Sequence, residues 1–195
     1  ITEAVNAAGL TWGAIDTIAV TYGPGLASSL LVGLHAARGL ALGLEKPLKG
    51  INHIEAHAYS PFLSPAAPAL ADVVPFLALV VSGGHTCFIE VTDIGTYRVI
   101  GQTLDDAAGE AFDKAAKLLG LGYPGGPAID RAAGAATYAG DLRFPHGRVT
   151  PDNPGLGTMR PELCVSFSGL KTSLLYHLRQ HPPADSAVVN AIAAS

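Results

Sequence analysis

Residues 76–91 read FLALVVSGGHTCFIEV, which is two apolar runs joined by Ser82-Gly83-Gly84. The runs Phe76–Val81 and His85–Val91 predict the strands of a hairpin, because they are rich in β-branched and aromatic residues and a glycine-containing turn separates them. Tyr97–Gly101 predicts a third strand. The turn glycines lack a Cβ, so their backbone amides are open to a phosphate. For these three residues alone, an ordinary hairpin turn is the simpler interpretation.

Toward the N-terminus, predicted strands and helices alternate. Ile15–Thr21 is an apolar, β-branched run that leads to the tight turn Gly23-Pro24-Gly25, and it predicts a strand. Apolar residues at helical spacing then predict a helix over Leu26–Leu44. A short strand, Leu48–Ile51, leads into a second helix over about Asn52–Leu63. This alternation is typical of the α/β class.

A stretch rich in proline and alanine, Ser64–Pro75, predicts the boundary between two lobes. The fold class expected is α/β, with a first lobe at 1–70 and a second at 76–195, and a cleft between them. The helices and the loop predicted for the second lobe after its hairpin are Asp105–Leu119, the loop Gly120–Pro127, a short helix to Gly134, and Leu170–Arg179.

Composition narrows the class of protein. The chain has 195 residues, 49% of them apolar and 14% charged, which excludes intrinsic disorder and permits a real core. A net charge of −4 argues against a surface that coats nucleic acid. No apolar run approaches the roughly 20 residues of a membrane span, and Cys87 and Cys164 match no disulfide or metal spacing. We expect a cytoplasmic protein that does not act at a membrane, and, because it begins at Ile1, a fragment.

The segment Asn52-His53-Ile54-Glu55-Ala56-His57 contains two histidines four residues apart. On a helix both rings leave the same face, about 6 Å apart along the axis, where they can bind one metal ion. Two surface histidines are an equally good interpretation of the pair alone. Glu55 points to the opposite side, so it cannot serve as the base of an H-E-x-x-H peptidase. A carboxylate from elsewhere would have to complete the metal site.

Acidic residues are concentrated between Asp105 and Asp130. The pairs Glu110/Lys114 and Asp113/Lys117 stand four residues apart with the acid first, which is typical of a solvated helix face. A helix carboxylate in this region is also suited to accept hydrogen bonds from ribose hydroxyls.

Five segments, taken in order, resemble the tRNA adenosine threonylcarbamoyltransferase family, formerly called O-sialoglycoprotein endopeptidases, and in particular its bacterial branch. They are Tyr22–Gly33 (YGPGLASSLLVG), Asn52–His57 (NHIEAH), Leu79–Thr86 (LVVSGGHT), Asp105–Pro127 (DDAAGEAFDKAAKLLGLGYPGGP) and Ser166–Thr172 (SFSGLKT). The resemblance implies a two-lobed, actin-like or sugar-kinase-like α/β fold, incomplete at both ends. It also implies transfer of a threonylcarbamoyl group from its adenylate to the exocyclic amine of the adenosine beside the anticodon, in tRNAs that read codons beginning with A.

The resemblance also assigns roles to residues. His53 and His57 match the family's metal-binding histidines, and one divalent metal ion is expected, iron in preference to zinc. The positions that match those contacting threonylcarbamoyl-adenylate are Val80, Val81, Ser82, Gly83, Gly84, Asp113, Gly126 and Asp130. No catalytic residue is assigned. The expected partners are tRNA, an actin-like paralogue and a small ATPase of the same bacterial pathway.

Parts of the family pattern are missing from this chain. Ala56 and Ser28 stand where the family usually has glycine, and both are small changes. The family's opening strand, its later asparagine-bearing glycine motif and the aspartate that completes the metal site are absent, so we expect this fragment alone to be inactive. Three alternatives are a metal-dependent peptidase, a non-catalytic actin-like scaffold of the same pathway, and a small-molecule kinase. The misplaced Glu55 argues against the peptidase, and the histidine pair argues against the scaffold.

Overall fold

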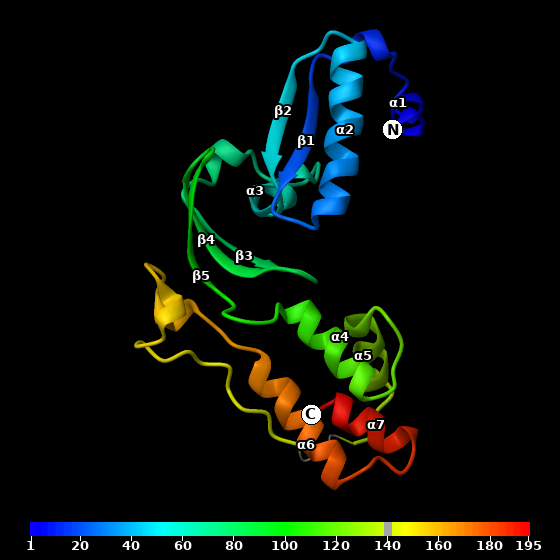
Figure 1. Cartoon of the computed structure of the whole chain (residues 1–195), viewed down its shortest axis with the longest axis vertical. Helices are drawn as coiled ribbons and strands as arrows, with labels where there is room; N and C mark the ends of the chain where they lie inside the picture. The colour runs from blue at the N-terminus through cyan, green and yellow to red at the C-terminus, as the bar shows by residue number, and fades with distance from the viewer. Residues whose placement is uncertain (139–141) are drawn as a thin grey trace. The chain divides into compact units, whose positions relative to one another are not determined.

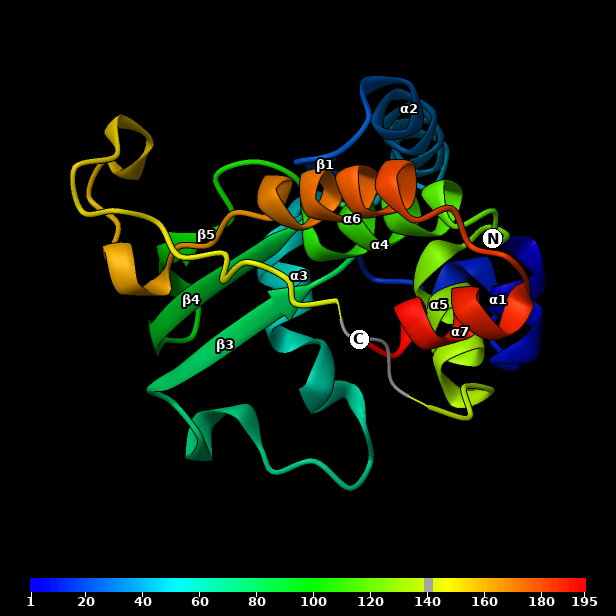
Figure 2. The same cartoon turned by 90° about the horizontal axis from the view of Figure 1, so that it is seen from below.

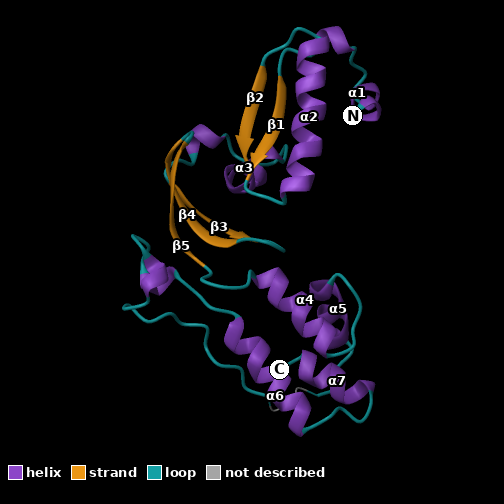
Figure 3. Cartoon of the chain, viewed as in Figure 1, coloured by secondary structure: helices purple, strands orange, loops and turns teal. Residues whose placement is uncertain are grey.

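The computed structural model describes residues 1–138 and 142–195. Contacts divide the chain into two compact units, Ile1–Asp72 and Val73–Ser195, and the division falls within the Pro/Ala stretch. Each unit combines helices with a small sheet (Figures 1 and 3). The α/β class predicted from the sequence is therefore confirmed.

The first unit is built on two parallel strands with a long helix against them. The strands β1 and β2 pair in parallel, with Ile18 opposite Leu48. The helix α2 runs beside both strands, as the ribbon in Figure 1 shows. The elements of the first unit are α1 (Thr2–Ala7), a 3-10 turn at Trp12–Ala14, β1 (Ile18–Gly23), α2 (Ala27–Gly43), β2 (Leu48–Asn52), α3 (His53–Tyr59), and 3-10 turns at Ser60–Leu63 and Leu70–Asp72.

The short helix α3 begins directly at the end of β2 because Asn52 caps it. The side-chain oxygen of Asn52 accepts hydrogen bonds from the amides of Ile54 (2.9 Å) and Glu55 (3.2 Å). An asparagine in this position satisfies amides that otherwise have no partner within the helix. The helix predicted over Asn52–Leu63 is shorter than expected, since its last turn is 3-10 and Pro61 lies within that turn.

In its described residues, 73–138 and 142–195, the second unit contains a three-stranded antiparallel sheet followed by four α-helices. The strands lie in the order β3-β4-β5, with Val81 opposite Thr86 at the hairpin turn. Figure 2 shows α5 and α7 together at one end of this unit, away from β3 and β4. The elements are β3 (Phe76–Val81), β4 (Thr86–Asp93), β5 (Thr96–Gln102), α4 (Ala108–Leu118), α5 (Gly125–Gly134), 3-10 turns at Pro154–Leu156 and Pro161–Leu163, α6 (Ser168–Gln180) and α7 (Ser186–Ala193).

The two faces of the β3–β4 hairpin differ in burial. Val80, Ile89 and Val91 are buried on one face, with Ile89 and Val91 fully enclosed. On the opposite face, Leu79 and Val81 remain more than half exposed. Because side chains alternate along a strand, the turn at Ser82 follows directly on one buried and one exposed valine.

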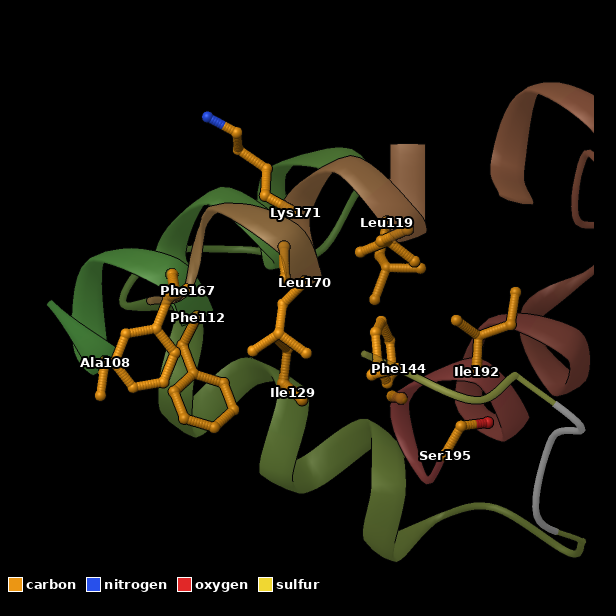
Figure 4. Close-up of a pocket in the computed structure, with 14 residues that line it drawn as sticks. Ala108, Phe112, Leu119, Ile129, Phe144, Phe167, Leu170, Lys171, Ile192 and Ser195 are labelled. Atoms are coloured by element: carbon orange, nitrogen blue, oxygen red, sulfur yellow. The ribbon is translucent and has the colours of Figure 1, made fainter. Parts of the chain in front are cut away.

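The helices of the second unit pack around a separate apolar core. Leu119, Leu174 and Ile192 are buried together, from the end of α4, from α6 and from α7. A hollow of about 270 Å³ adjoins this core. Figure 4 shows the rings of Phe112 and Phe167 at one end of it, while the Lys171 ammonium points away. The lining is mostly apolar and includes none of the predicted site residues, so this hollow is not the candidate functional site.

Two predicted boundaries in this unit are wrong. The helix predicted from Asp105 begins at Ala108, because Asp105 bonds instead to the amide of Phe167 (2.7 Å). The loop predicted over Gly120–Pro127 ends early, because α5 already starts at Gly125.

Candidate functional site

The predicted metal ligands lie in the first unit, on α3. The ring centroids of His53 and His57 are 4.6 Å apart, and the ring planes meet at 70°. His53 also lines a hollow of about 490 Å³ between β1 and the start of α2, which includes Thr21, Pro24 and Ser29. The cap at Asn52 fixes the first turn of α3, and with it the direction in which the His53 side chain leaves the backbone.

This pair supplies part of a metal site. Neutral imidazole nitrogens suit iron and zinc, and two rings on one face of a helix can hold one ion. Among residues 1–138 and 142–195, no group of three or more histidine, cysteine, aspartate or glutamate side chains is arranged to hold a metal ion. The two imidazoles can therefore supply two ligands of a metal ion, and its other ligands would have to come from elsewhere.

The predicted phosphate loop lies in the second unit, between β3 and β4. Its turn is closed by the Ser82 amide, which donates to the His85 carbonyl (2.8 Å), and by the His85 amide, which donates to Ser82 Oγ (3.1 Å). Gly83 and Gly84 are exposed, and no hydrogen bond within the described part of the chain uses their amides. Two adjacent amides are therefore available to an anion at the tip of the turn.

Val80 and Val81, also predicted to contact the adenylate, differ in exposure. The Val80 side chain is buried in the sheet, so only its backbone is available to a ligand. The Val81 side chain is 57% exposed on the opposite face.

The loop rests on the beginning of α4. The Gly109 amide donates to the Ser82 carbonyl (3.2 Å), and the Ala108 amide donates to the buried Thr86 hydroxyl (2.9 Å). These two bonds attach the first turn of α4 to both sides of the hairpin turn. The position of the loop is thus set by a helix that also carries Asp113.

Asp113 is placed differently from the solvated helix face predicted for it. Its Oδ1 accepts a hydrogen bond from the Gly125 amide (2.7 Å) at the start of α5. In the described part of the chain Asp113 forms no ion pair with Lys117, so the Asp113/Lys117 pair predicted from spacing is wrong. The carboxylate is half-buried and oriented by a neighbouring helix, which leaves Oδ2 as its second acceptor.

The other predicted pair, Glu110 and Lys114, forms as expected. Lys114 Nζ lies 2.8 Å from Glu110 and 2.6 Å from Asp106. Hydrogen bonds to Asp106 and then to Glu110 raise the pKa of Lys114. Lys114 is therefore held as a cation on a face of α4 other than the one that carries Gly109 and Asp113.

The last two predicted adenylate positions lie on α5. Gly126 and Asp130 are four residues apart and so share a face of this helix, with Asp130 exposed. The second unit thus brings the loop at Ser82–Gly84, Asp113 and the start of α5 together around α4. The two histidines belong to the first unit.

Comparison with known sequences shows the family of this chain. A family description of TsaD, tRNA N6-adenosine threonylcarbamoyltransferase, matches residues 1–195. The chain belongs to the TsaD family.

Curated relatives agree with this assignment. The TsaD enzymes named tRNA N6-adenosine threonylcarbamoyltransferase from Anaeromyxobacter sp. (strain Fw109-5) and Geobacter sp. (strain M21) are 51% and 50% identical to the chain, over 93% and 100% of it. The enzyme of that name from Salinibacter ruber is 53% identical over 88% of the chain. The chain spans about half the length of these relatives, 50%, 53% and 47% respectively.

Among solved structures, YeaZ from Pseudomonas aeruginosa aligns with a TM-score of 0.36 and 19% identity, over 50% of this chain and 45% of that chain. This likeness is too low to carry a conclusion.

No helix in the described ranges is both long and apolar enough to cross a membrane.

Two features of this TsaD chain, the cap at Asn52 and the contact of Asp105 with the start of α6, were not predicted from the sequence. Asn52 followed by Glu55 three residues later is the signature of a capped helix start, so the Asn52 cap could have been predicted. The contact between Asp105 and the start of α6 could not, since it joins residues 62 apart. The Asp105 carboxylate also accepts from the Ser166 hydroxyl, beside a polar hollow of about 620 Å³.

Proposed function

We propose that the protein containing this chain transfers a threonylcarbamoyl group from threonylcarbamoyl-adenylate to the N6 amine of the adenosine next to the anticodon, in tRNAs that read codons beginning with A. The observation that carries the proposal is the match of the TsaD family over residues 1–195. Relatives about 50% identical bear the name of this activity.

The second unit is suited to hold the adenylate. The exposed amides of Gly83 and Gly84 can donate to the phosphate without an intervening Cβ. Asp113 presents Oδ2 as an acceptor for a ribose hydroxyl while the Gly125 amide occupies Oδ1. Gly126 and Asp130 lie on one face of the adjoining helix, where they can contact the rest of the nucleoside.

The transfer itself needs stabilisation of the leaving phosphate. The N6 amine attacks the carbamoyl carbonyl carbon, the new C–N bond forms, the amine loses a proton, and the bond to the phosphate oxygen breaks so that AMP leaves with the electron pair. Amides fixed at Gly83 and Gly84 are suited to stabilise the negative charge that develops on that phosphate. No residue of this chain is assigned as the base.

The imidazoles of His53 and His57 would hold one divalent metal ion, for which we favour iron over zinc. Such an ion supplies a positive charge that can orient the threonyl carboxylate or polarise the carbonyl. The two rings are arranged at the beginning and end of one helical turn, which keeps both on the same side of α3.

We also propose that the full-length protein uses tRNA as the acceptor, has an actin-like paralogue and a small ATPase as partners, and is located in the cytoplasm. The proposed lobes, 1–70 with the histidine helix and 76–195 with the nucleotide loop, would contribute the metal and the adenylate site respectively.

The test is transfer of labelled threonylcarbamoyl from its adenylate to tRNA by the full-length protein. Transfer by the unmodified protein, with loss of about a hundredfold in His57→Ala, would support the proposal. His35→Ala is the matched control, because His35 is an exposed histidine whose ring bonds to the Leu31 carbonyl (2.9 Å) of its own helix. Absence of transfer, or chelator-sensitive casein cleavage in its place, would refute it.

A further inference from the structure

Two glycines of the second unit lie where no side chain fits. A Cβ on Gly109 would stand 2.7 Å from Gly83 Cα and 2.8 Å from the Ser82 carbonyl oxygen. A Cβ on Gly125 would stand 2.5 Å from Asp113 Cα and 2.6 Å from the Phe112 carbonyl oxygen. All four neighbours are backbone atoms, which cannot move aside as the end of a flexible side chain can. The backbone of α4 thus lies close against the loop at Gly109 and close against the start of α5 at Asp113.

The two contacts lie one turn apart on α4. Gly109 and Asp113 are four residues apart, so they share a face of the helix and are separated by about 6 Å along its axis. Each contact also includes a hydrogen bond, from the Gly109 amide to the Ser82 carbonyl (3.2 Å) and from the Gly125 amide to Asp113 Oδ1 (2.7 Å). The exposed glycine amides and the Asp113 carboxylate are therefore held one helical turn apart along α4.

We propose that Gly109 and Gly125 are positioning residues that set the spacing between the phosphate-binding and the ribose-binding parts of the adenylate site. The inference rests on the proposed function. Neither glycine touches the substrate. Gly109 fixes the distance of the loop amides from α4, and Gly125 fixes the orientation of the Asp113 carboxylate. The separation suits a ligand in which one ribose joins a phosphate to the hydroxyls that the carboxylate binds.

Alanine substitutions at the two glycines should affect different parts of ligand recognition. Gly109→Ala pushes the loop away from α4 and should weaken recognition of the phosphate. Gly125→Ala pushes the start of α5 away from Asp113 and should weaken recognition of the ribose hydroxyls. A general loss of packing would lower both kinds of recognition by the same factor.

The experiment measures dissociation constants of AMP, adenosine and 2′,3′-dideoxyadenosine for the full-length protein by calorimetry. The preference for AMP over adenosine should fall about tenfold in Gly109→Ala, and the preference for adenosine over its dideoxy analogue should stay unchanged. In Gly125→Ala the pattern should reverse. Gly134→Ala is the control and should alter neither preference, because among the described residues no atom beyond the neighbouring backbone of α5 lies within 4 Å of the added Cβ.

A second variant keeps the test valid if Gly109→Ala does not fold. Thr86→Val removes the hydroxyl that accepts from the Ala108 amide (2.9 Å) and loosens the same junction without a clash. It should lower the phosphate preference about threefold and leave the ribose preference intact. Equal loss of both preferences, or loss of neither, would overturn the positioning roles. A wild-type protein without a phosphate or ribose preference would instead overturn the proposed adenylate site, and this inference with it.

Discussion

The amide of Phe167 donates a hydrogen bond of 2.7 Å to Oδ1 of Asp105 and so joins two segments that are 62 residues apart. Oδ2 of the same carboxylate accepts from the Ser166 hydroxyl. Asp105 lies between β5 and α4, and Phe167 is the residue from which α6 begins. One carboxylate therefore ties the start of α6 to the segment that leads into α4, the helix on which the candidate adenylate site is built.

This relationship predicts an acid-sensitive contribution to stability. Partial burial acts to raise the pKa of Asp105, but the bonds from Ser166, Phe167 and Ser168 outweigh it and hold the pKa below the ordinary value of 3.8. A lowered pKa in the folded state means that the contribution is complete above pH 3.8 and is lost as the pH falls through the lower, folded value. Asp105 is exposed, so solvent screens its interactions, and Asp105→Ala should lower the free energy of unfolding by only about 0.5–1 kcal/mol at pH 7, and by less as the pH falls below 3.8.

Urea unfolding of both proteins at a series of pH values measures this difference. Glu162→Gln, at an exposed position in the same unit, is the control and should change the free energy little at any pH. A constant difference between Asp105→Ala and the unmodified protein down to the lowest pH would contradict the role of the charge.

A second prediction concerns the apolar core of the helices. Leu174 is 2% exposed and packs with Leu119 and Ile192. Leu174→Ala should lower the free energy of unfolding by about 2–4 kcal/mol, because the lost side chain leaves a cavity next to an existing hollow. Leu42→Ala, which removes a leucine that is 80% exposed, should cost less than about 0.5 kcal/mol. Similar costs for the two variants, measured by chemical denaturation, would show that this core is not formed in solution.

A third prediction concerns the two free thiols. Cys87 and Cys164 are both buried and unpaired, and burial raises the pKa of Cys87. A raised pKa lowers the thiolate fraction at neutral pH, and the thiolate is the reactive form. A thiol reagent should therefore label Cys87 much more slowly in the native protein than in urea, and a reductant should leave Tm unchanged. Rapid native labelling of Cys87, identified by mass spectrometry of its peptide, would contradict the burial.

How much of this fold could be predicted depends on the range of the interactions. The strand Phe76–Val81 was predicted with the bounds that the structure gives it, because an apolar run ending at Ser-Gly-Gly is a local signal. The spacing of Glu110 and Lys114 likewise predicted their ion pair. Asp113 has the same spacing to Lys117, but the amide of Gly125 binds it instead, and that amide becomes a neighbour only after α5 packs on α4.

The same distinction applies to the candidate site. The types and spacing of His53 and His57 pointed to paired rings, and the rings are 4.6 Å apart. The close packing at Gly109 and Gly125 could not be predicted, because a glycine in a helix gives no sign of what lies against it. Only the backbone atoms that surround these positions distinguish them from Gly134, where the space is open.

The last prediction links the cap of α3 to metal binding. Asn52 accepts from the Ile54 and Glu55 amides, so Asn52→Ala should destabilise α3 by about 1 kcal/mol and lower Tm by a few degrees. Because His53 is the first residue of this helix, fraying at the cap should also spread the two rings and weaken binding of Zn²⁺ to the full-length protein severalfold. Asn52→Asp retains an oxygen that can cap the helix and should restore both Tm and affinity, whereas His57→Ala should lose affinity without a comparable loss of Tm. If Asn52→Ala lowered Tm but left the calorimetric Zn²⁺ affinity unchanged, the cap would serve the fold alone and would not position the histidine pair.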